Sequence, residues 1–162
     1  MAKGDYEIGT TPSLLERLLD TDPASPHDPQ GRRWHGVTEF RTAVQRDLEH
    51  LLNTRNGYHD LSADFAEASQ SVLTYGLADF STLSVTSATD QGRLRQAVEQ
   101  TIRTFEPRLA GVSVTVLPAV KGERVLSLRI DARLLVEPTP EPVTFDVVMP
   151  LATAKYEVSE GN

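Results

Sequence analysis

The chain has 162 residues, which is the size of a single domain. Hydrophobic residues make up 39% and charged residues 24% of the sequence, values typical of a soluble globular protein rather than a disordered one. The net charge of -7 argues against nucleic acid as a partner, because phosphate binding depends on clustered Lys and Arg. Cysteine is absent, which excludes disulfides and thiolate metal sites and is typical of a cytoplasmic protein.

Neither an export signal nor a membrane helix is predicted. Residues 1–10 are polar and acidic, whereas a secretory signal needs an apolar stretch. No window reaches the roughly 18 apolar residues that mark a membrane helix. We therefore expect a protein that does not insert directly into a membrane.

The first 31 residues are expected to form a short helix and a linker. Thr11-Pro12 supplies a helix start, and leucines follow it at helical spacing. A helix of about two turns is unstable alone, so its leucine face must dock either on this domain or on a neighbouring subunit. Residues 21–31 are rich in proline, which predicts a linker, and Trp34 after it suits either an interface or a core. The leucines of the stripe are Leu14, Leu15, Leu18 and Leu19.

Two longer amphipathic helices are predicted further along the chain. Apolar residues recur at three- and four-residue steps over residues 37–52, and Asn56-Gly57 is expected to end that helix. A second stripe covers residues 94–105, with Asp90 near the helix start as a possible cap. Proline disfavours helical geometry in the residue before it, so Pro107 should end this helix near Glu106. Residues 58–89 are predicted to be mostly loop.

The last third of the chain changes from helical to strand periodicity. Apolar and polar residues alternate over residues 112–116, 126–136 and 143–151, which predicts three strands with one polar face each. Short turns between them favour an antiparallel meander. The predicted fold is α+β: amphipathic helices packed on a C-terminal three-stranded antiparallel sheet, in one two-layer domain. Its expected bounds are residues 32–152, followed by a C-terminal tail at residues 153–162.

No catalytic, metal or cofactor site is predicted. The histidines lack the spacing of metal ligands, and neither a nucleophile elbow nor a glycine-rich phosphate loop is present. Carboxylate pairs for glycoside hydrolysis are hard to single out among 23 acidic residues. Glu16 with Asp20, and Asp131 on its polar strand face, are both typical of solvated surface.

Three segments together resemble the TssE family, the baseplate wedge subunits of bacterial type VI secretion systems. They are Leu51-Leu52-Asn53-Thr54-Arg55, Tyr75-Gly76-Leu77-Ala78-Asp79-Phe80 and Phe105-Glu106-Pro107-Arg108-Leu109. Their order and spacing also agree with the family, so the resemblance covers roughly residues 12–151. It implies a non-enzymatic subunit similar to a wedge component of contractile phage tails.

The resemblance also implies partners and a location. The expected partners are other wedge subunits of the TssF, TssG and TssK type and sheath proteins of the TssB and TssC type. The subunit would join the wedge to the contractile sheath and help start sheath polymerisation, in the cytoplasm at a baseplate docked to the inner membrane. The family has carried a lysozyme label, so a peptidoglycan-cleaving hydrolase is the alternative, and a free-standing adaptor is a further one.

Glu106, Pro107 and Arg108 are the candidate partner-binding residues. From the residues alone, an internal ion pair that accompanies the helix end is the favoured interpretation, whereas the resemblance favours a contact with other wedge subunits. A three-stranded sheet also has two edges that could accept a strand from a sheath protein, and residues 112–116 and 143–147 are the expected edge segments.

Overall fold

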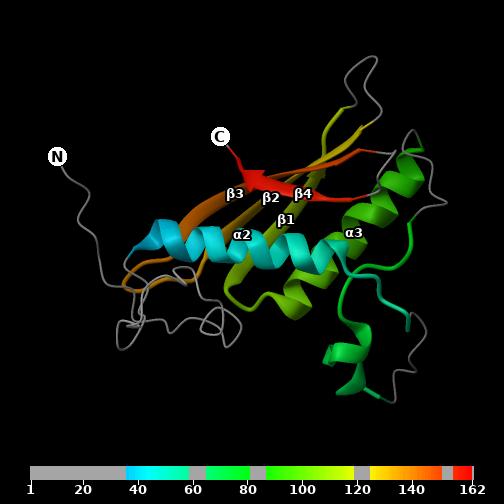
Figure 1. The fold of residues 1–162 in the computed structure, drawn as a ribbon, viewed down its shortest axis with the longest axis horizontal. Coiled ribbons are helices and arrows are strands. Elements are labelled where there is room, and N and C mark those ends of the chain that lie inside the picture. The colour runs from blue at the N-terminus through cyan, green and yellow to red at the C-terminus, as the bar shows by residue number, and fades with distance from the viewer. Residues whose placement is uncertain (1–35, 59–64, 81–86, 119–124, 151–154, 162) are drawn as a thin grey trace, which may run out of the picture.

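The computed structural model describes residues 36–58, 65–80, 87–118, 125–150 and 155–161 (Figure 1). The predictions for the leucine stripe at residues 14–19, the proline-rich segment and Trp34 lie outside the described residues.

Helix α2, Val37–Asn53, presents the predicted apolar stripe to the core. It ends three residues before the expected Asn56-Gly57 stop, because Thr54 is already extended while its amide still bonds to the carbonyl of His50 at 3.0 Å. Asn56 instead fixes the loop that follows, since its amide donates to the carbonyl of Leu77 at 2.8 Å. The buried residues of α2 are Phe40, Ala43, Val44, Leu48, Leu51 and Leu52.

The chain between the two long helices contains two short 3-10 helices, η1 (Ala68–Gln70) and η2 (Val72–Thr74). After η2 the chain returns to the end of α2 through a parallel bridge between Arg55 and Leu77. Gly76 permits this approach, since its φ is 103° and a Cβ there would lie 2.3 Å from the carbonyl oxygen of Thr54. This glycine therefore fixes how the loop returns to the end of α2.

Helix α3, Ala88–Phe105, buries Leu94, Val98 and Ile102 on one face. Its N-cap is Ser87 rather than Asp90, because the Ser87 hydroxyl accepts a hydrogen bond from the amide of Asp90 at 3.3 Å. The helix ends at Phe105, as the following proline predicts.

The sheet has four antiparallel strands in the order β1-β2-β3-β4, one more than predicted. Three match the predicted meander: β1 (Leu109–Val116), β2 (Val125–Leu134) and β3 (Glu141–Pro150). The fourth, β4 (Glu157–Glu160), pairs with β3 inside the segment expected to be a tail. It escaped prediction because a four-residue strand offers too little alternation to recognise.

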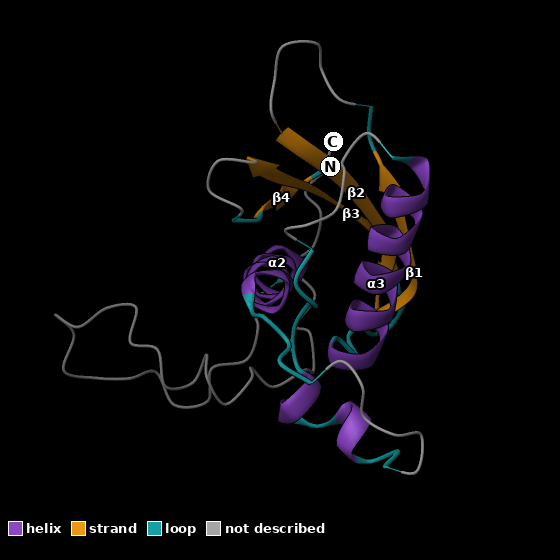
Figure 2. Ribbon diagram, turned by 90° about the vertical axis from the view of Figure 1, so that its right-hand side faces the viewer, coloured by secondary structure: helices purple, strands orange, loops and turns teal. Residues whose placement is uncertain are grey.

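Both helices cover the same face of the sheet, which confirms the two-layer α+β arrangement. Alternate residues of β2 and β3 are buried against the helices, whereas the intervening ones form a polar face, where Arg129 donates to Asp146 at 2.9 Å. Helix α3 lies over β1, and α2 runs beside β4 (Figure 2). The large side chains that are fully buried in this core include Phe40, Phe145, Leu48, Ile102, Leu128 and Ile130.

Candidate functional site

The predicted site residues lie in a tight corner, residues 105–109, between α3 and β1. The amide of Glu106 still bonds to the carbonyl of Ile102 at 2.8 Å, and the amide of Leu109 bonds to the carbonyl of Glu106 at 3.2 Å. Pro107 stands between these two bonds and is exposed. The chain therefore changes from helix to strand within three residues, around a proline whose φ is fixed by its ring.

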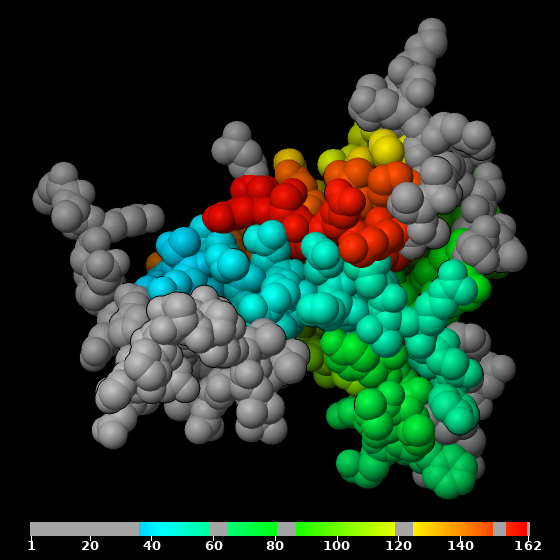
Figure 3. Space-filling view, viewed as in Figure 1, coloured from blue at the N-terminus to red at the C-terminus, as the bar shows by residue number. Residues whose placement is uncertain are grey.

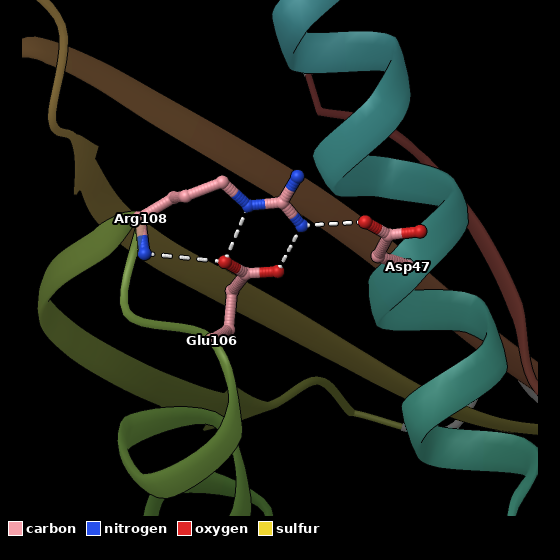
Figure 4. Close-up of polar contacts among 3 residues, drawn as sticks. All are labelled: Asp47, Glu106 and Arg108. Atoms are coloured by element: carbon pink, nitrogen blue, oxygen red, sulfur yellow. Dashed lines mark hydrogen bonds and ion pairs between the residues drawn. The ribbon is translucent and has the colours of Figure 1, made fainter. Parts of the chain in front are cut away.

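Glu106 and Arg108 form a bidentate ion pair inside this corner (Figure 4). Arg108 donates from Nε to Glu106 Oε1 at 2.6 Å and from Nη2 to Oε2 at 2.5 Å. The backbone amide of Arg108 also donates to Oε1, at 3.2 Å. Because the Glu106 side chain is only 5% exposed, this carboxylate depends on Arg108 to compensate for its lost hydration.

Helix α2 supplies a second carboxylate to the same guanidinium. Arg108 Nη2 donates to Asp47 Oδ2 at 2.6 Å (Figure 4). The guanidinium carbon of Arg108 also lies 5.8 Å from the centre of the Phe40 ring. One arginine thus connects the α3–β1 junction to α2 through two carboxylates and an aromatic face. The corner is a structural brace as well as a turn.

The electrostatics of the corner follow from this arrangement. Burial alone lowers the pKa of Arg108, but the hydrogen bonds and negative charges of Glu106 and Asp47 outweigh it and raise that pKa. The pKa of the nearby Tyr75 phenol is also raised, first by burial and then by the two carboxylates. Arg108 is therefore a permanent cation, and Tyr75 beside it stays neutral.

The three predicted site residues differ in how far their side chains are exposed. Glu106 is buried, Pro107 is exposed, and Arg108 turns inward, so the internal ion pair favoured from the residues alone is present. Arg108 still has one donor, Nη1, that makes no hydrogen bond to any residue in the described part of the chain.

Two functional residues of the corner were missed by sequence reasoning. Asp47 and Phe40 lie on α2, far from the corner in sequence. The signal for Asp47 was its position between the buried Val44 and Leu48, where a carboxylate at the border of an apolar stripe calls for a partner. The pattern does not say which of the 16 basic residues that partner is.

The edge of the sheet at β4 is closed by polar side chains of α2. Asn53 bonds twice to Tyr156, donating from Nδ2 to its carbonyl and accepting from its amide, at 2.8 and 2.9 Å. Gln45 donates to the carbonyl of Val158 at 2.8 Å, and Glu49 accepts from its amide at 3.3 Å. Gln45, Glu49 and Asn53, which we call the α2 stripe, thus pair with the backbone as a neighbouring strand would.

The opposite edge, at β1, is closed in the same way by α3. Arg103 donates to the carbonyl of Val112 at 2.7 Å, and Glu99 accepts from the amide of Val114 at 3.0 Å. The expected edge at residues 143–147 is wrong, because β3 pairs with β2 on one side and β4 on the other. The expected edge at residues 112–116 is an edge, although an incoming strand there would have to replace these side-chain contacts.

The charged residues of the corner do not form the free carboxylate pair that glycoside hydrolysis uses, since Glu106 and Asp47 share one guanidinium. Within the described ranges, no group of three His, Cys, Asp or Glu residues could hold a metal ion. No helix among the described residues is long and apolar enough to cross a membrane.

Comparison with known proteins gives one family. The model of the family described as baseplate wedge protein gp25 matches residues 38–139. The match extends from the start of α2 to the turn after β2, and it includes the corner, Asp47 and the loop between the helices. No curated protein matches the chain.

Proposed function

The chain belongs to the baseplate wedge protein gp25 family, and from that membership we propose that it is a structural subunit of the baseplate of a type VI secretion system. The family match carries the structural role. The secretion-system assignment is supported by the three motifs at residues 51–55, 75–80 and 105–109, which resemble those of TssE. On this proposal the subunit works in the cytoplasm, at a baseplate docked to the inner membrane.

We propose that the corner is a contact with other wedge subunits, of the TssF, TssG or TssK type. Pro107 supports this, because it is exposed and held in one conformation by the two hydrogen bonds and the ion pair around it. The Nη1 group of Arg108 also supports it, since a partner carboxylate could accept a hydrogen bond from this donor. Glu106 then acts indirectly, by holding Arg108 in place.

We also propose that the subunit joins the wedge to sheath proteins of the TssB and TssC type and helps sheath polymerisation to start. The two sheet edges support this role. Their outward backbone groups at Val112, Val114, Tyr156 and Val158 bond to side chains rather than to a strand. A partner strand could replace such bonds one for one, because each side-chain bond contributes only about 1 kcal/mol net.

The hydrolase alternative is not supported by any carboxylate pair that we find. A peptidoglycan hydrolase needs one carboxyl group to act as an acid and another to act as a base or nucleophile. The closest carboxylates at the corner both accept hydrogen bonds from Arg108, so neither is free to face a sugar as a separate acid or nucleophile. We therefore propose that the protein is not an enzyme.

The corner contact is tested by changing its exposed proline. Pro107→Asp puts a negative charge next to the expected partner carboxylate while leaving buried groups intact. We expect the variant to fold normally but to bind co-expressed wedge subunits about tenfold more weakly, because one unfavourable charge contact is worth about 1.4 kcal/mol. The readout is the amount of wedge subunit that co-purifies with a tag on the chain.

Pro142→Asp is the matched control, because Pro142 is also exposed but lies on the polar face of the sheet, opposite Arg133. It should co-purify with wedge subunits as the unaltered chain does. If Pro107→Asp and Pro142→Asp bind wedge subunits equally well, the corner is not part of the interface.

A further inference from the structure

The exposed apolar side chains of the protein gather on both sides of the corner. Most of them lie on the loop that holds η1 and η2, residues 65–76, which we call the projecting loop because it stands out from the body below α2 (Figure 3). The large apolar residues that are exposed in the described part of the chain are Tyr58, Phe65, Val72, Leu73 and Leu135.

The projecting loop has a defined shape despite having no core of its own. Neither η1 nor η2 buries a residue, and Val72 is 84% exposed. Its conformation is held by polar bonds: the Thr74 hydroxyl donates to the carbonyl of Ser69 at 2.9 Å, and the Ser71 hydroxyl accepts from the amide of Leu73 at 3.2 Å. Fixed polar bonding beneath exposed Phe65, Val72 and Leu73 is typical of a surface that docks rather than one that only links two helices.

The projecting loop is continuous with the corner. Tyr75, the residue after η2, packs edge-on against Phe105, the last residue of α3, with 5.3 Å between ring centres. On the other side of the corner, the amide of the exposed Leu135 bonds to the carbonyl of Arg108 at 2.8 Å. Pro107 therefore lies between the exposed apolar side chains of the projecting loop and the exposed Leu135, which follows β2.

The size and shape of this surface indicate its occupant. A specific interface buries roughly 800 Å² per partner, and four partly exposed side chains, Phe65, Val72, Leu73 and Leu135, supply only part of that area. They suit part of a larger heterologous interface. The projecting loop is convex (Figure 3), so its complement is a concave apolar surface, and the unbonded Nη1 of Arg108 calls for a carboxylate beside it.

We propose that the projecting loop and Leu135 insert into an apolar groove on another wedge subunit, a groove that carries a carboxylate at its rim for Arg108. This inference rests on the proposed function and gives the corner an apolar anchor on each side. The charged contact at Arg108 sets the orientation, while Val72, Leu73 and Leu135 contribute most of the affinity.

The test replaces one exposed apolar residue on each side of the corner. Val72→Asp and Leu135→Asp would each place an unpaired charge in the apolar groove, whereas neither side chain is part of the chain's own core. Thr115→Asp is the control, because Thr115 is exposed on the polar face of the sheet, opposite Arg129. All three variants should have the thermal stability of the unaltered chain.

Binding of each purified chain to the purified complex of the other wedge subunits is then measured by biolayer interferometry. We expect Val72→Asp and Leu135→Asp to weaken binding at least about tenfold, and Thr115→Asp to leave it unchanged. A photo-crosslinking residue at position 72 should join the chain to an apolar segment of one wedge subunit.

Three outcomes overturn the inference. If the unaltered chain binds and both Asp variants bind as tightly as it does, the projecting loop and Leu135 do not insert into a groove, while the proposed function stands. If the crosslink joins two copies of this chain, the occupant is a second copy. If the unaltered chain binds no wedge subunit, the inference and the proposed function both fail.

Discussion

Arg108 combines a role in folding with a proposed role in binding, and a sequence motif alone cannot separate the two. Its Nε and Nη2 atoms hold the buried Glu106 and the Asp47 carboxylate of α2, which is a role in folding. Its Nη1 donor bonds to none of the residues that the structure describes, and a bond from it to a partner is the proposed role in binding. A loss of assembly after mutation of Arg108 would therefore say little about binding, and Pro107 is the better probe.

The role in folding predicts a large loss of stability for Arg108→Glu. The variant removes the partner of a buried carboxylate and brings a third negative charge to Glu106 and Asp47, so we expect the free energy of unfolding to fall by about 3 kcal/mol. Denaturant titration measures this change.

Arg55→Glu is the matched control, because the Arg55–Asp79 ion pair is exposed on both sides, at 71% and 48%. Such surface pairs contribute about 1 kcal/mol or less. If Arg108→Glu lost no more stability than Arg55→Glu, the brace described for the corner would be wrong.

At the scale of elements, the two helices do more than cover the sheet. Each lines up polar side chains one turn apart, at positions 45, 49 and 53 on α2 and 99 and 103 on α3, and directs them at a strand edge. Exposed edges invite unwanted pairing with other chains. The side chains of the two helices therefore keep both edges occupied.

The α2 stripe should hold β4 in place. Asn53→Ala removes both hydrogen bonds to Tyr156, so we expect faster hydrogen exchange at residues 156–160 and a loss of about 2 kcal/mol in the free energy of unfolding. Hydrogen exchange followed by mass spectrometry resolves the segment.

His50→Ala is the control for this experiment, since His50 is exposed on α2 and lies outside the α2 stripe. It should leave exchange at β4 unchanged. Unchanged exchange in Asn53→Ala as well would mean that pairing with β3 alone holds β4.

The same elements show what could be predicted from the sequence. The apolar stripes of α2 and α3 and the alternation in β1 to β3 predict which face of each element is buried. The structure confirms these predictions, because the burial of apolar side chains determines how these elements pack. Strand β4 was missed, since four residues carry little pattern. At the site, Pro107 fixed the corner, but the bond from Arg108 to Asp47 spans 61 positions and depends on how α2 packs, which no local pattern contains.

Across the whole molecule, one region has the features proposed for partner contact. The corner, the projecting loop and Leu135 gather exposed apolar groups around one arginine, whereas the uncovered sheet face is polar and internally paired. Family membership over residues 38–139 assigns a baseplate role to this body. The described features suit a subunit that functions through its surface rather than through a catalytic pocket.

Size-exclusion chromatography with light scattering, on the purified chain mixed with purified wedge subunits, shows whether the chain is a stable part of the wedge. We expect the chain to elute in a single stable complex with those subunits, and we expect neither the chain nor the complex to release soluble fragments from peptidoglycan. A chain that stays separate from the wedge subunits and cleaves peptidoglycan would contradict it.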